Sequence, residues 1–182
     1  MRVIAGQAKG HNLKAPEGLA TRPTSDKVKG SLFSMLTGSV YGSRVLDLFA
    51  GSGALGIEAL SRGSESCVFI DMEKDAISCI NANLEHTKLS AKSKVLKTDS
   101  IKFLETCTGT FDVIFIDPPY NKGLAEKALK IIEQRELLAP SGVVSVERDE
   151  IEGEIKGILK LNCIKNKKYG RISLKIYKNG ID

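Results

Sequence analysis

The sequence lacks any long apolar run. Its longest such runs hold four residues each, at 67–70 and 113–116, whereas a helix that crosses a bilayer needs about 18 or more. The first ten residues also lack an apolar stretch followed by small residues, so they do not resemble a secretory signal. We therefore expect a cytoplasmic protein without a membrane segment.

Cysteine and histidine are scarce as well. His11 and His86 have no cysteine or acidic partner at ligand spacing, so we expect no bound metal. The cysteine spacings of 12, 28 and 56 positions match neither paired zinc ligands nor a dense disulfide framework. We expect reduced, packing thiols at all four positions, Cys67, Cys79, Cys107 and Cys163.

What remains is an ordinary globular composition. Hydrophobic residues make up 42% of the chain and charged residues 27%, the balance of a folded domain. A length of 182 residues suits one domain, and no repeat or linker interrupts it. We expect a single domain over residues 1–182, with an extension over 1–44 and a core over 45–182.

The excess positive charge lies in the extension. Residues 1–44 hold seven Lys and Arg against two acids, a net charge of +5, while residues 45–182 hold 20 of each sign. A basic arm beside a neutral body suits an enzyme that binds a polyanion, because Lys and Arg release counterions from phosphates. A solvated basic face explains the charge about equally well.

Residues 45–147 alternate strand-like apolar runs with helical periodicity, which predicts a mostly parallel sheet with helical crossovers. Thr24-Ser25-Asp26 can cap a helix that carries Val28 and Leu32 on one face. A short β hairpin and loop should precede that helix. Polar residues including Asn166 and Gly170 should form the turn of a C-terminal antiparallel hairpin. The predicted strands are 44–50, 66–71, 94–98, 111–117, 143–147, 159–165 and 171–177.

The strongest local signal is VLDLFAGSGALG at residues 45–56, a strand that enters G-x-G-x-x-G and then a helix. Glycines let a backbone approach a ligand closely, and the helix N-terminus directs free N–H groups at it. Asp71 follows at the end of the next strand, where it can accept hydrogen bonds from ribose hydroxyls. Asp47 adds a negative charge before the loop, which suits the cationic S-adenosylmethionine better than a dinucleotide pyrophosphate.

The second signal is Asp117-Pro118-Pro119-Tyr120, directly after an apolar strand. Two prolines make a rigid segment whose carbonyls can accept hydrogen bonds. A carboxylate and a carbonyl together can hold both hydrogens of an exocyclic amine, while a Tyr ring can stack on the base. This combination indicates a nucleobase amino group as the target.

These motifs resemble those of Rossmann-like methyltransferases that use S-adenosylmethionine and act on exocyclic amines. More closely, RPTSDKVKGSLF at 22–33, VLDLFAGSGALGIEALSRG at 45–63 and the Asp117–Tyr120 box resemble the RsmD family over nearly the whole chain. The resemblance implies a class I methyltransferase fold, α/β, with a short N-terminal β extension and a C-terminal antiparallel hairpin. Lys27 and Lys29 stand where that family usually has Arg, and Gly30 where it usually has Glu.

The resemblance also implies roles for individual residues. Asp71 would hold the ribose and Asp99 the adenine amino group. The four residues Asp117, Pro118, Pro119 and Tyr120 would clamp the target base and catalyse transfer. Three residues would cover the cofactor, Arg22, Thr24 and Asp26. The methionine portion would meet Asp47, Phe49, Gly51, Gly53 and Gly56.

The implied activity is methylation of the N2 amine of one guanine, of the guanine 966 type, in bacterial 16S ribosomal RNA. The partner would be this RNA or a partly assembled 30S subunit. A monomer would suffice for this activity, but the sequence does not fix the oligomeric state. A DNA adenine-N6 methyltransferase would share the catalytic elements. A dehydrogenase leaves the Asp117–Tyr120 box without a purpose, and a noncatalytic RNA-binding module is the remaining alternative. The basic hairpin turn is either a solvated tip or a second RNA contact, through Lys165, Lys167, Lys168 and Arg171.

Overall fold

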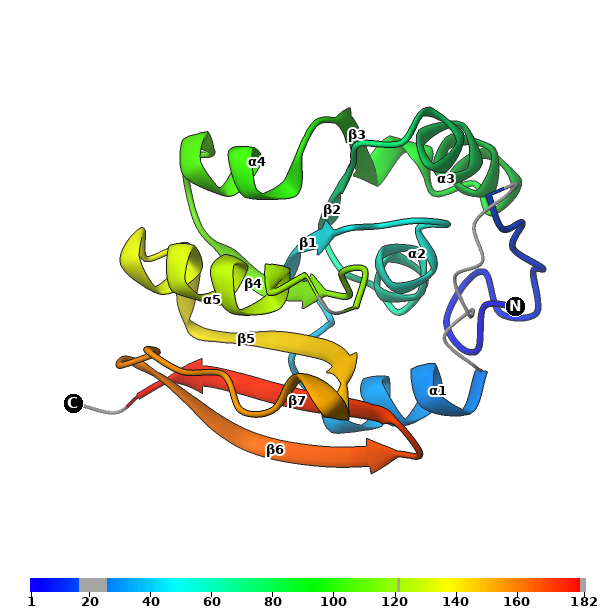
Figure 1. Ribbon diagram of the computed structural model, residues 1–182. Coiled ribbons are helices and arrows are strands. Elements are labelled where there is room, and N and C mark those ends of the chain that lie inside the picture. The colour runs from blue at the N-terminus through cyan, green and yellow to red at the C-terminus, as the bar shows by residue number, and fades with distance from the viewer. Residues whose placement is uncertain (17–25, 121, 181–182) are drawn as a thin grey trace.

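The structure is a computed structural model that describes residues 1–16, 26–120 and 122–180. Its seven-stranded sheet has the order β3-β2-β1-β4-β5-β7-β6 (Figure 1). The first five strands in this order are parallel, and β7 and β6 are antiparallel to their neighbours. The predicted fold class is therefore confirmed. The strands are β1 (Arg44–Leu48), β2 (Ser66–Asp71), β3 (Ser93–Lys97), β4 (Phe111–Ile116), β5 (Leu138–Asp149), β6 (Leu161–Tyr169) and β7 (Ile172–Asn179).

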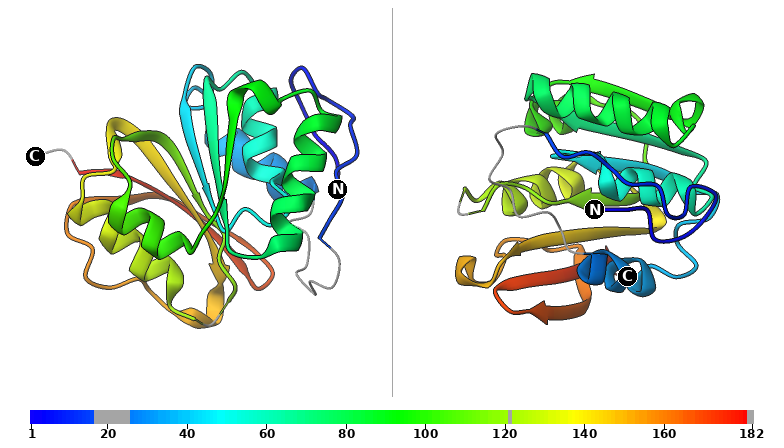
Figure 2. Two further views of the ribbon diagram at one scale, coloured as in Figure 1. Left: turned by 90° about the horizontal axis from the view of Figure 1, so that it is seen from above. Right: turned by 90° about the vertical axis from the view of Figure 1, so that its right-hand side faces the viewer.

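Helices cover both faces of the sheet (Figure 2). One face is covered by α1, α2 and α3, and the other by α4 and α5. Among the described residues, no helix has the length and apolar character needed to cross a membrane. The helices are α1 (Asp26–Met35), α2 (Ala54–Ser61), α3 (Lys74–His86), α4 (Ser100–Thr106) and α5 (Leu124–Gln134), with short 3₁₀ turns at Ser90–Lys92 and Glu150–Glu152.

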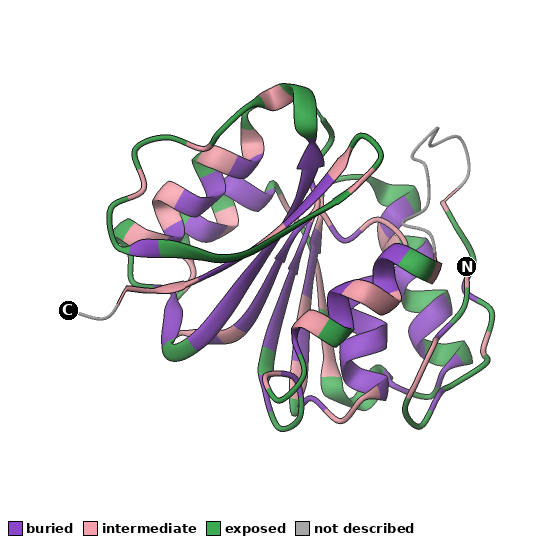
Figure 3. Cartoon of the chain, turned by 90° about the horizontal axis from the view of Figure 1, so that it is seen from below, coloured by how far each residue is buried: buried purple, intermediate pink, exposed green. Residues whose placement is uncertain are grey.

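The central strands are buried on both sides, as Figure 3 shows. In β4, Val113 and Phe115 join the core under α1 and α2, whereas Ile114 and Ile116 join the core under α4 and α5. A strand with helices on both faces needs apolar side chains in both directions. This explains why the sequence shows continuous apolar runs here.

Helix α2 is buried along its whole length, because the N-terminal segment packs over its outer side. The backbone N–H groups of Ile4 and Ala5 donate to the Glu58 carboxylate of α2 at 2.8 and 3.0 Å. Within this segment, the described residues form a single antiparallel bridge, Arg2 with Asn12. The expected short β extension is thus reduced to one bridge that serves as an outer layer for α2.

Several predicted strand boundaries differ from the structure by one or two residues, and two differ by more. β5 begins at Leu138, five residues before the predicted start, because Leu138 pairs with Phe111 ahead of a register shift in β4. Asn166 lies inside β6, paired with Lys175, and not in the turn. An edge strand exposed along most of its length carries polar residues, so composition alone does not separate this strand from a turn. The turn is at Gly170, whose φ is 60°.

Candidate active site

The glycine loop joins the carboxyl end of β1 to the first turn of α2. Phe49, Gly51 and Gly53 have φ angles of 58°, 56° and 77°, a left-handed conformation that glycine adopts without strain. Gly56 is required for packing, because a Cβ at this position would lie 2.3 Å from the Phe69 ring. The loop therefore turns sharply and lies tightly against β2, as the predicted cofactor cradle requires.

Asp47 is buried within β1, at 2% exposure. Its Oδ2 atom accepts a hydrogen bond from the Gly56 N–H at 2.9 Å, which fixes the first turn of α2. Burial raises the pKa of Asp47 to about 8, the Gly56 N–H opposes this rise, and the charge of Asp71 adds to it. A positive charge beside Asp47 would favour the ionised carboxylate. The Asp47 carboxyl therefore fits a ligand that carries an ammonium or sulfonium group.

Asp71 holds the other end of the same loop. Its Oδ2 atom accepts from the Gly51 N–H at 2.8 Å, and its Oδ1 atom accepts from the Glu73 N–H at 2.9 Å. A carboxylate offers about four acceptor positions, so these bonds leave capacity for ribose hydroxyls. The predicted ribose ligand is thus also a brace for the glycine loop, a second role that the spacing did not indicate.

Acidic residues stand at or near the carboxyl ends of five neighbouring parallel strands. In sheet order from β3 to β5 they are Asp99, Asp71, Asp47, Asp117 and Glu147. Ligands of open α/β sheets bind at this edge. The sequence identified the first four of these acids, and the sheet order places them in one row.

Asp99 caps α4, since its Oδ1 atom accepts from the Lys102 N–H at 2.8 Å. The side chain is exposed at the end of the row, next to β2. Its predicted contact with an adenine amino group is compatible with this cap, because the cap occupies one acceptor position of the carboxylate.

The Asp117–Tyr120 box begins one residue after β4 ends. Pro118 is buried, Asp117 is half-buried and Tyr120 is 37% exposed. The Tyr120 hydroxyl donates to Glu147 Oε1 at 3.2 Å. Burial raises the pKa of Tyr120, and the negative charges of Glu147 and Asp117 raise it further. The hydroxyl therefore stays protonated and the ring is held at the edge of the acidic row.

The sequence analysis missed Glu147 as a site residue. It is only 4% exposed, yet it was assigned simply to the end of a predicted strand. The available signal was a run of four charged residues, 147–150, directly after the apolar part of β5. Asp149 is also buried and pairs with Arg171 at 2.9 Å. Buried charges in such a position need partners, and here a partner of Glu147 is the predicted stacking residue.

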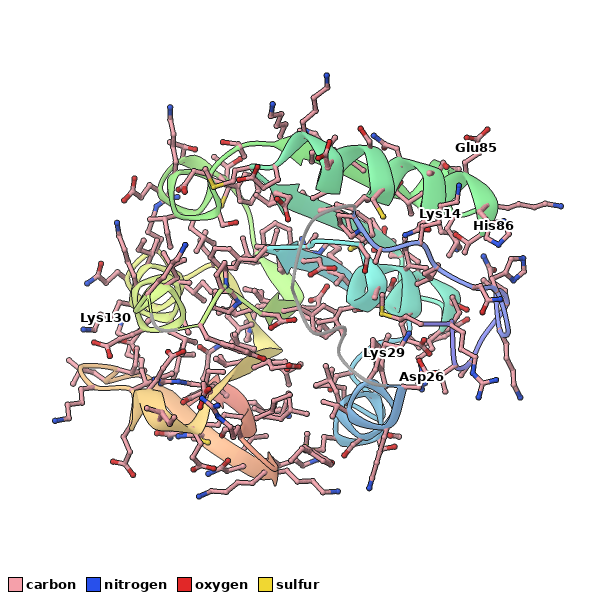
Figure 4. The ribbon with its side chains drawn as sticks, turned by 45° about the vertical axis from the view of Figure 1, so that its right-hand side comes forward. Lys14, Asp26, Lys29, Glu85, His86 and Lys130 are labelled. Atoms are coloured by element: carbon pink, nitrogen blue, oxygen red, sulfur yellow. The ribbon has the colours of Figure 1, made fainter. Side chains whose placement is uncertain are left out.

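The predicted cofactor cover is only partly within the described residues. Arg22 and Thr24 lie outside them. Asp26 opens α1 and pairs with Arg2, whose Nε atom is 3.2 Å from Asp26 Oδ2. This pair joins the N-terminal segment to α1 (Figure 4). Contact of Asp26 with a cofactor remains a prediction.

One cation of the basic arm, Lys29, is not available to RNA. Its side chain is fully buried, with Nζ 3.2 Å from Glu58 Oε2 and 2.6 Å from the Arg2 carbonyl oxygen. Burial lowers the pKa of Lys29, and the Glu58 charge opposes this change. Figure 4 shows Lys29 between α1 and the N-terminal segment. The Lys29 ammonium group therefore links α1 and the N-terminal segment to Glu58 of α2, and it is not accessible to a ligand.

Arg44 is likewise unsuited to the predicted site. It opens β1 at the amino edge of the sheet, opposite the acidic row. Its Nε atom lies 3.2 Å from Asp112 Oδ2. The sequence placed Arg44 in the basic arm by position alone, whereas the direction of β1 carries it away from the site.

His11 and His86, far apart in sequence, are in contact in the structure. Their ring centroids lie 5.1 Å apart in an edge-to-face arrangement. Over residues 1–16, 26–120 and 122–180, no three His, Cys, Asp or Glu side chains gather as a metal site would require. The pair fastens the N-terminal segment to the end of α3.

Asn83 of α3 connects the N-terminal segment with the glycine loop. It is 1% exposed. Its Oδ1 atom accepts from the Lys14 N–H at 2.9 Å, and its Nδ2 atom donates to the carbonyls of Lys14 and Ser52 at 3.0 and 2.9 Å. Ser52 lies between the first two glycines of the loop. The Asn83 side chain thereby makes the two hydrogen bonds to the Lys14 backbone that a neighbouring strand would make. Its bond to Ser52 holds the glycine loop at the same time.

Comparison with known proteins assigns the chain to a family. Residues 1–178 match the family model described as "Conserved hypothetical protein 95". The chain belongs to this family. A Bacillus subtilis protein named "Putative rRNA methyltransferase YlbH" is 42% identical over 98% of both chains. A Haemophilus influenzae "Ribosomal RNA small subunit methyltransferase D" is 34% identical over 98% of this chain and 94% of its own. The resemblance to the RsmD family is therefore confirmed.

Solved structures support the fold. An Escherichia coli structure named "Putative methyltransferase yhhF" has a TM-score of 0.90 and 31% identity, and the match covers 100% of this chain and 99% of that one. A more distant structure, described as "SMU.776, a putative methyltransferase complexed with SAH", has a TM-score of 0.68 at 20% identity over 84% of this chain and 48% of its own. The second likeness concerns the fold alone.

Proposed function

We propose that this protein transfers a methyl group from S-adenosylmethionine to the N2 amine of one guanine, of the guanine 966 type, in 16S ribosomal RNA. The observation that carries the proposal is the row of acids beside the glycine loop, which includes Asp117 and holds Tyr120 through Glu147. The names of the relatives support ribosomal RNA of the small subunit as the substrate.

The residues of the chain fit the cofactor. Asp47 offers a buried carboxyl for a cationic group, and Asp71 offers acceptor positions for ribose hydroxyls at the same loop. When bound, S-adenosylmethionine supplies an activated methyl group on a sulfonium. The protein then has to hold the target amine in line with it, and such positioning lowers a barrier by roughly 7 to 11 kcal/mol.

Asp117 and the Pro118 carbonyl would accept the two hydrogens of the guanine amine. This arrangement would favour a more tetrahedral nitrogen with an available electron pair, which could take up the activated methyl group that the bound cofactor would supply. The nitrogen would then lose a proton, which the Asp117 carboxylate could accept in addition to orienting the amine. The target base would first leave its stack in the RNA, which costs a few kcal/mol and least within a loop. Tyr120 would then stack on the exposed base.

The test is methyl transfer to 16S RNA and to 30S particles from a strain that lacks this modification, followed by mapping of the modified nucleotide. We expect one N2-methylguanine. Transfer to adenine N6 in DNA would overturn the proposal in favour of the DNA methyltransferase alternative. Tight binding of a pyridine dinucleotide without binding of S-adenosylmethionine would exclude the whole methyltransferase assignment.

A further inference from the structure

Two basic segments that are distant in sequence lie side by side in the fold. Residues 161–179, which form β6, β7 and their turn, contain six Lys and Arg and no acid. Helix α1 comes from the basic N-terminal quarter of the chain and lies beside the end of β6 (Figures 1 and 2). The exposed lysine of α1, Lys27, therefore lies on the same side of the molecule as the cations of the hairpin.

A β-bulge directs two lysines of β6 toward α1. The register with β7 shifts between Cys163 and Lys165, so that Lys165 and Lys167 pair with Ile176 and Leu174. These two β7 residues belong to the core on the α1 side of the sheet. A bulge inserts one residue and changes the face on which the following side chains point. Lys165 and Lys167 consequently stand on the same side as α1.

Direct contacts join these lysines to α1. Lys165 Nζ donates to the Met35 carbonyl at 2.8 Å, and Lys167 Nζ lies 3.3 Å from Ser31 Oγ. The Tyr169 hydroxyl bonds to Ser31 as well, and Lys167 Nζ is 5.5 Å from the centre of the Tyr169 ring. This surface, formed by α1 and the facing side of β6, is called the α1–β6 seam below.

The cations on and beside the seam differ in whether they form ion pairs. Lys168 and Arg171, on the same hairpin, pair with Glu150 and Asp149. Within the described part of the chain, the exposed residues Lys27, Lys165 and Lys167 form no ion pair. Lys27 lies near enough to Tyr169 for its charge to act on that side chain. These three cations are thus available to an anion from outside.

One end of the seam reaches the candidate active site. Tyr169 pairs with Ile172 at the turn of the hairpin, and Ile172 also pairs with Asp149 of β5. Asp149 is two residues from Glu147, which holds Tyr120. An extended strand of nucleic acid along the seam would therefore be led toward the predicted stacking residue.

We propose that the α1–β6 seam binds the sugar–phosphate backbone of the RNA whose target base enters at Tyr120, through Lys27, Lys165 and Lys167. This inference rests on the proposed RNA substrate. Lys165 and Lys167 are two residues apart on one strand, about 6.6 Å along its axis, and can reach successive phosphates. The competing explanation is that lysines on an edge strand only prevent pairing with other chains.

The test measures binding of a 16S RNA fragment by a Lys27→Ala, Lys165→Ala, Lys167→Ala triple variant over a range of salt concentrations. Loss of three phosphate contacts should weaken binding at least tenfold and reduce the slope of log K against log salt by about 2. The matched control changes three exposed lysines away from α1, Lys92, Lys94 and Lys127, to alanine, and it should bind like the wild type. Affinity for S-adenosylmethionine should be unchanged in both variants.

A second set of variants separates charge from folding. Arginine at the three seam positions should restore RNA affinity, and Lys27→Gln, which removes only one exposed charge, should lower the salt slope by about 0.7. Equal binding by the seam triple and its control would overturn the proposal, as would loss of binding that arginine does not restore. If the wild type binds RNA through the seam yet transfers no methyl group, the proposed function fails and the seam stands.

Discussion

Carboxylates of the acidic row accept hydrogen bonds from the protein backbone and are also expected to contact the ligands. Asp47 and Asp71 each accept a backbone N–H from the glycine loop, so a change at either position disturbs the loop as well as the predicted cofactor contact. Asp117 stands outside the loop, directly after β4. Replacing it should therefore affect the reaction without a comparable effect on cofactor binding.

This difference predicts opposite behaviour for two alanine variants. Asp117→Ala should keep cofactor affinity near the wild-type value and lower methyl transfer roughly 100-fold, because the amine loses its acceptor. Asp71→Ala should weaken cofactor binding about tenfold or more, since it loses charge-assisted hydrogen bonds. Calorimetry with S-adenosylmethionine and single-turnover transfer distinguish the two. Near-normal turnover of Asp117→Ala would remove Asp117 from catalysis.

The bond between Tyr120 and Glu147 predicts a positioning role for Glu147. Removing the bond from either side, by Tyr120→Phe or Glu147→Leu, should lower kcat about tenfold without changing cofactor affinity, because a hydrogen bond to a charged group contributes about 1.5 to 3 kcal/mol. Glu147→Gln keeps an acceptor oxygen and should retain most activity.

The double variant is the control for this bond. If Glu147 acts through Tyr120, the two losses should not add, as a double-mutant cycle measures. Full additivity, or full activity of Tyr120→Phe, would contradict the role.

The raised pKa of Asp47 predicts that the free energy of unfolding depends on pH. Burial raises its folded-state pKa from 3.8 to about 8, so the stability that its neutral form contributes is complete below about pH 4 and is lost as the pH rises toward 8. Asp47→Asn keeps the acceptor for Gly56 and cannot ionise. Relative to this variant, the unliganded wild type should lose up to about 1.4 kcal/mol of unfolding free energy per pH unit in that window.

Denaturant unfolding at several pH values measures this difference. Cofactor binding at neutral pH should also release a proton from the wild type and none from Asp47→Asn, which calorimetry in buffers of different ionisation enthalpy detects. A constant stability difference between the two proteins from pH 4 to 8 would show that Asp47 is ionised throughout.

At the scale of elements, α3 transmits the position of the N-terminal segment to the glycine loop. Asn83→Ala would leave Lys14 and Ser52 with unpaired backbone groups, each at a cost of about 1 to 3 kcal/mol if they stay dry. We expect a lower melting temperature and several-fold weaker binding of S-adenosylmethionine. Asn81→Ala, at an exposed position of the same helix, should change stability by less than about 0.5 kcal/mol.

The two readouts of the Asn83 variant answer separate questions. A lower melting temperature alone would follow from any buried hydrogen bond. Weaker cofactor binding requires that the loop has moved, because Asn83 reaches the loop only through the Ser52 carbonyl. Unchanged affinity in a folded Asn83→Ala protein would therefore show that the segment and the loop are independent.

At the scale of the whole molecule, the basic extension is divided among different tasks. Lys29 joins the N-terminal segment and α1 to Glu58 of α2, and Arg44 pairs at the opposite edge of the sheet. Lys27 instead adds to the charge of the C-terminal hairpin. Net charge by segment predicts a basic surface, but the fold decides which cations form it.

The sequence by itself determined the features that depend on neighbouring residues. Apolar runs buried on both faces predict parallel strands, and the glycines at 51, 53 and 56 and the prolines at 118 and 119 restrict their own backbone. The acids at strand ends follow from the same local patterns. These features therefore include the sheet core, the glycine loop and four of the five acids in the row.

Only the tertiary structure decided the partners of the remaining polar residues. Glu147 contacts a residue 27 positions away, Asn83 contacts a backbone 69 positions away, and Lys167 contacts α1 at a separation of 136 positions. No local pattern records such a pairing, because a polar side chain has the same intrinsic preferences whether its partner is water or a distant residue. Burial removes the water, and the fold supplies the partner.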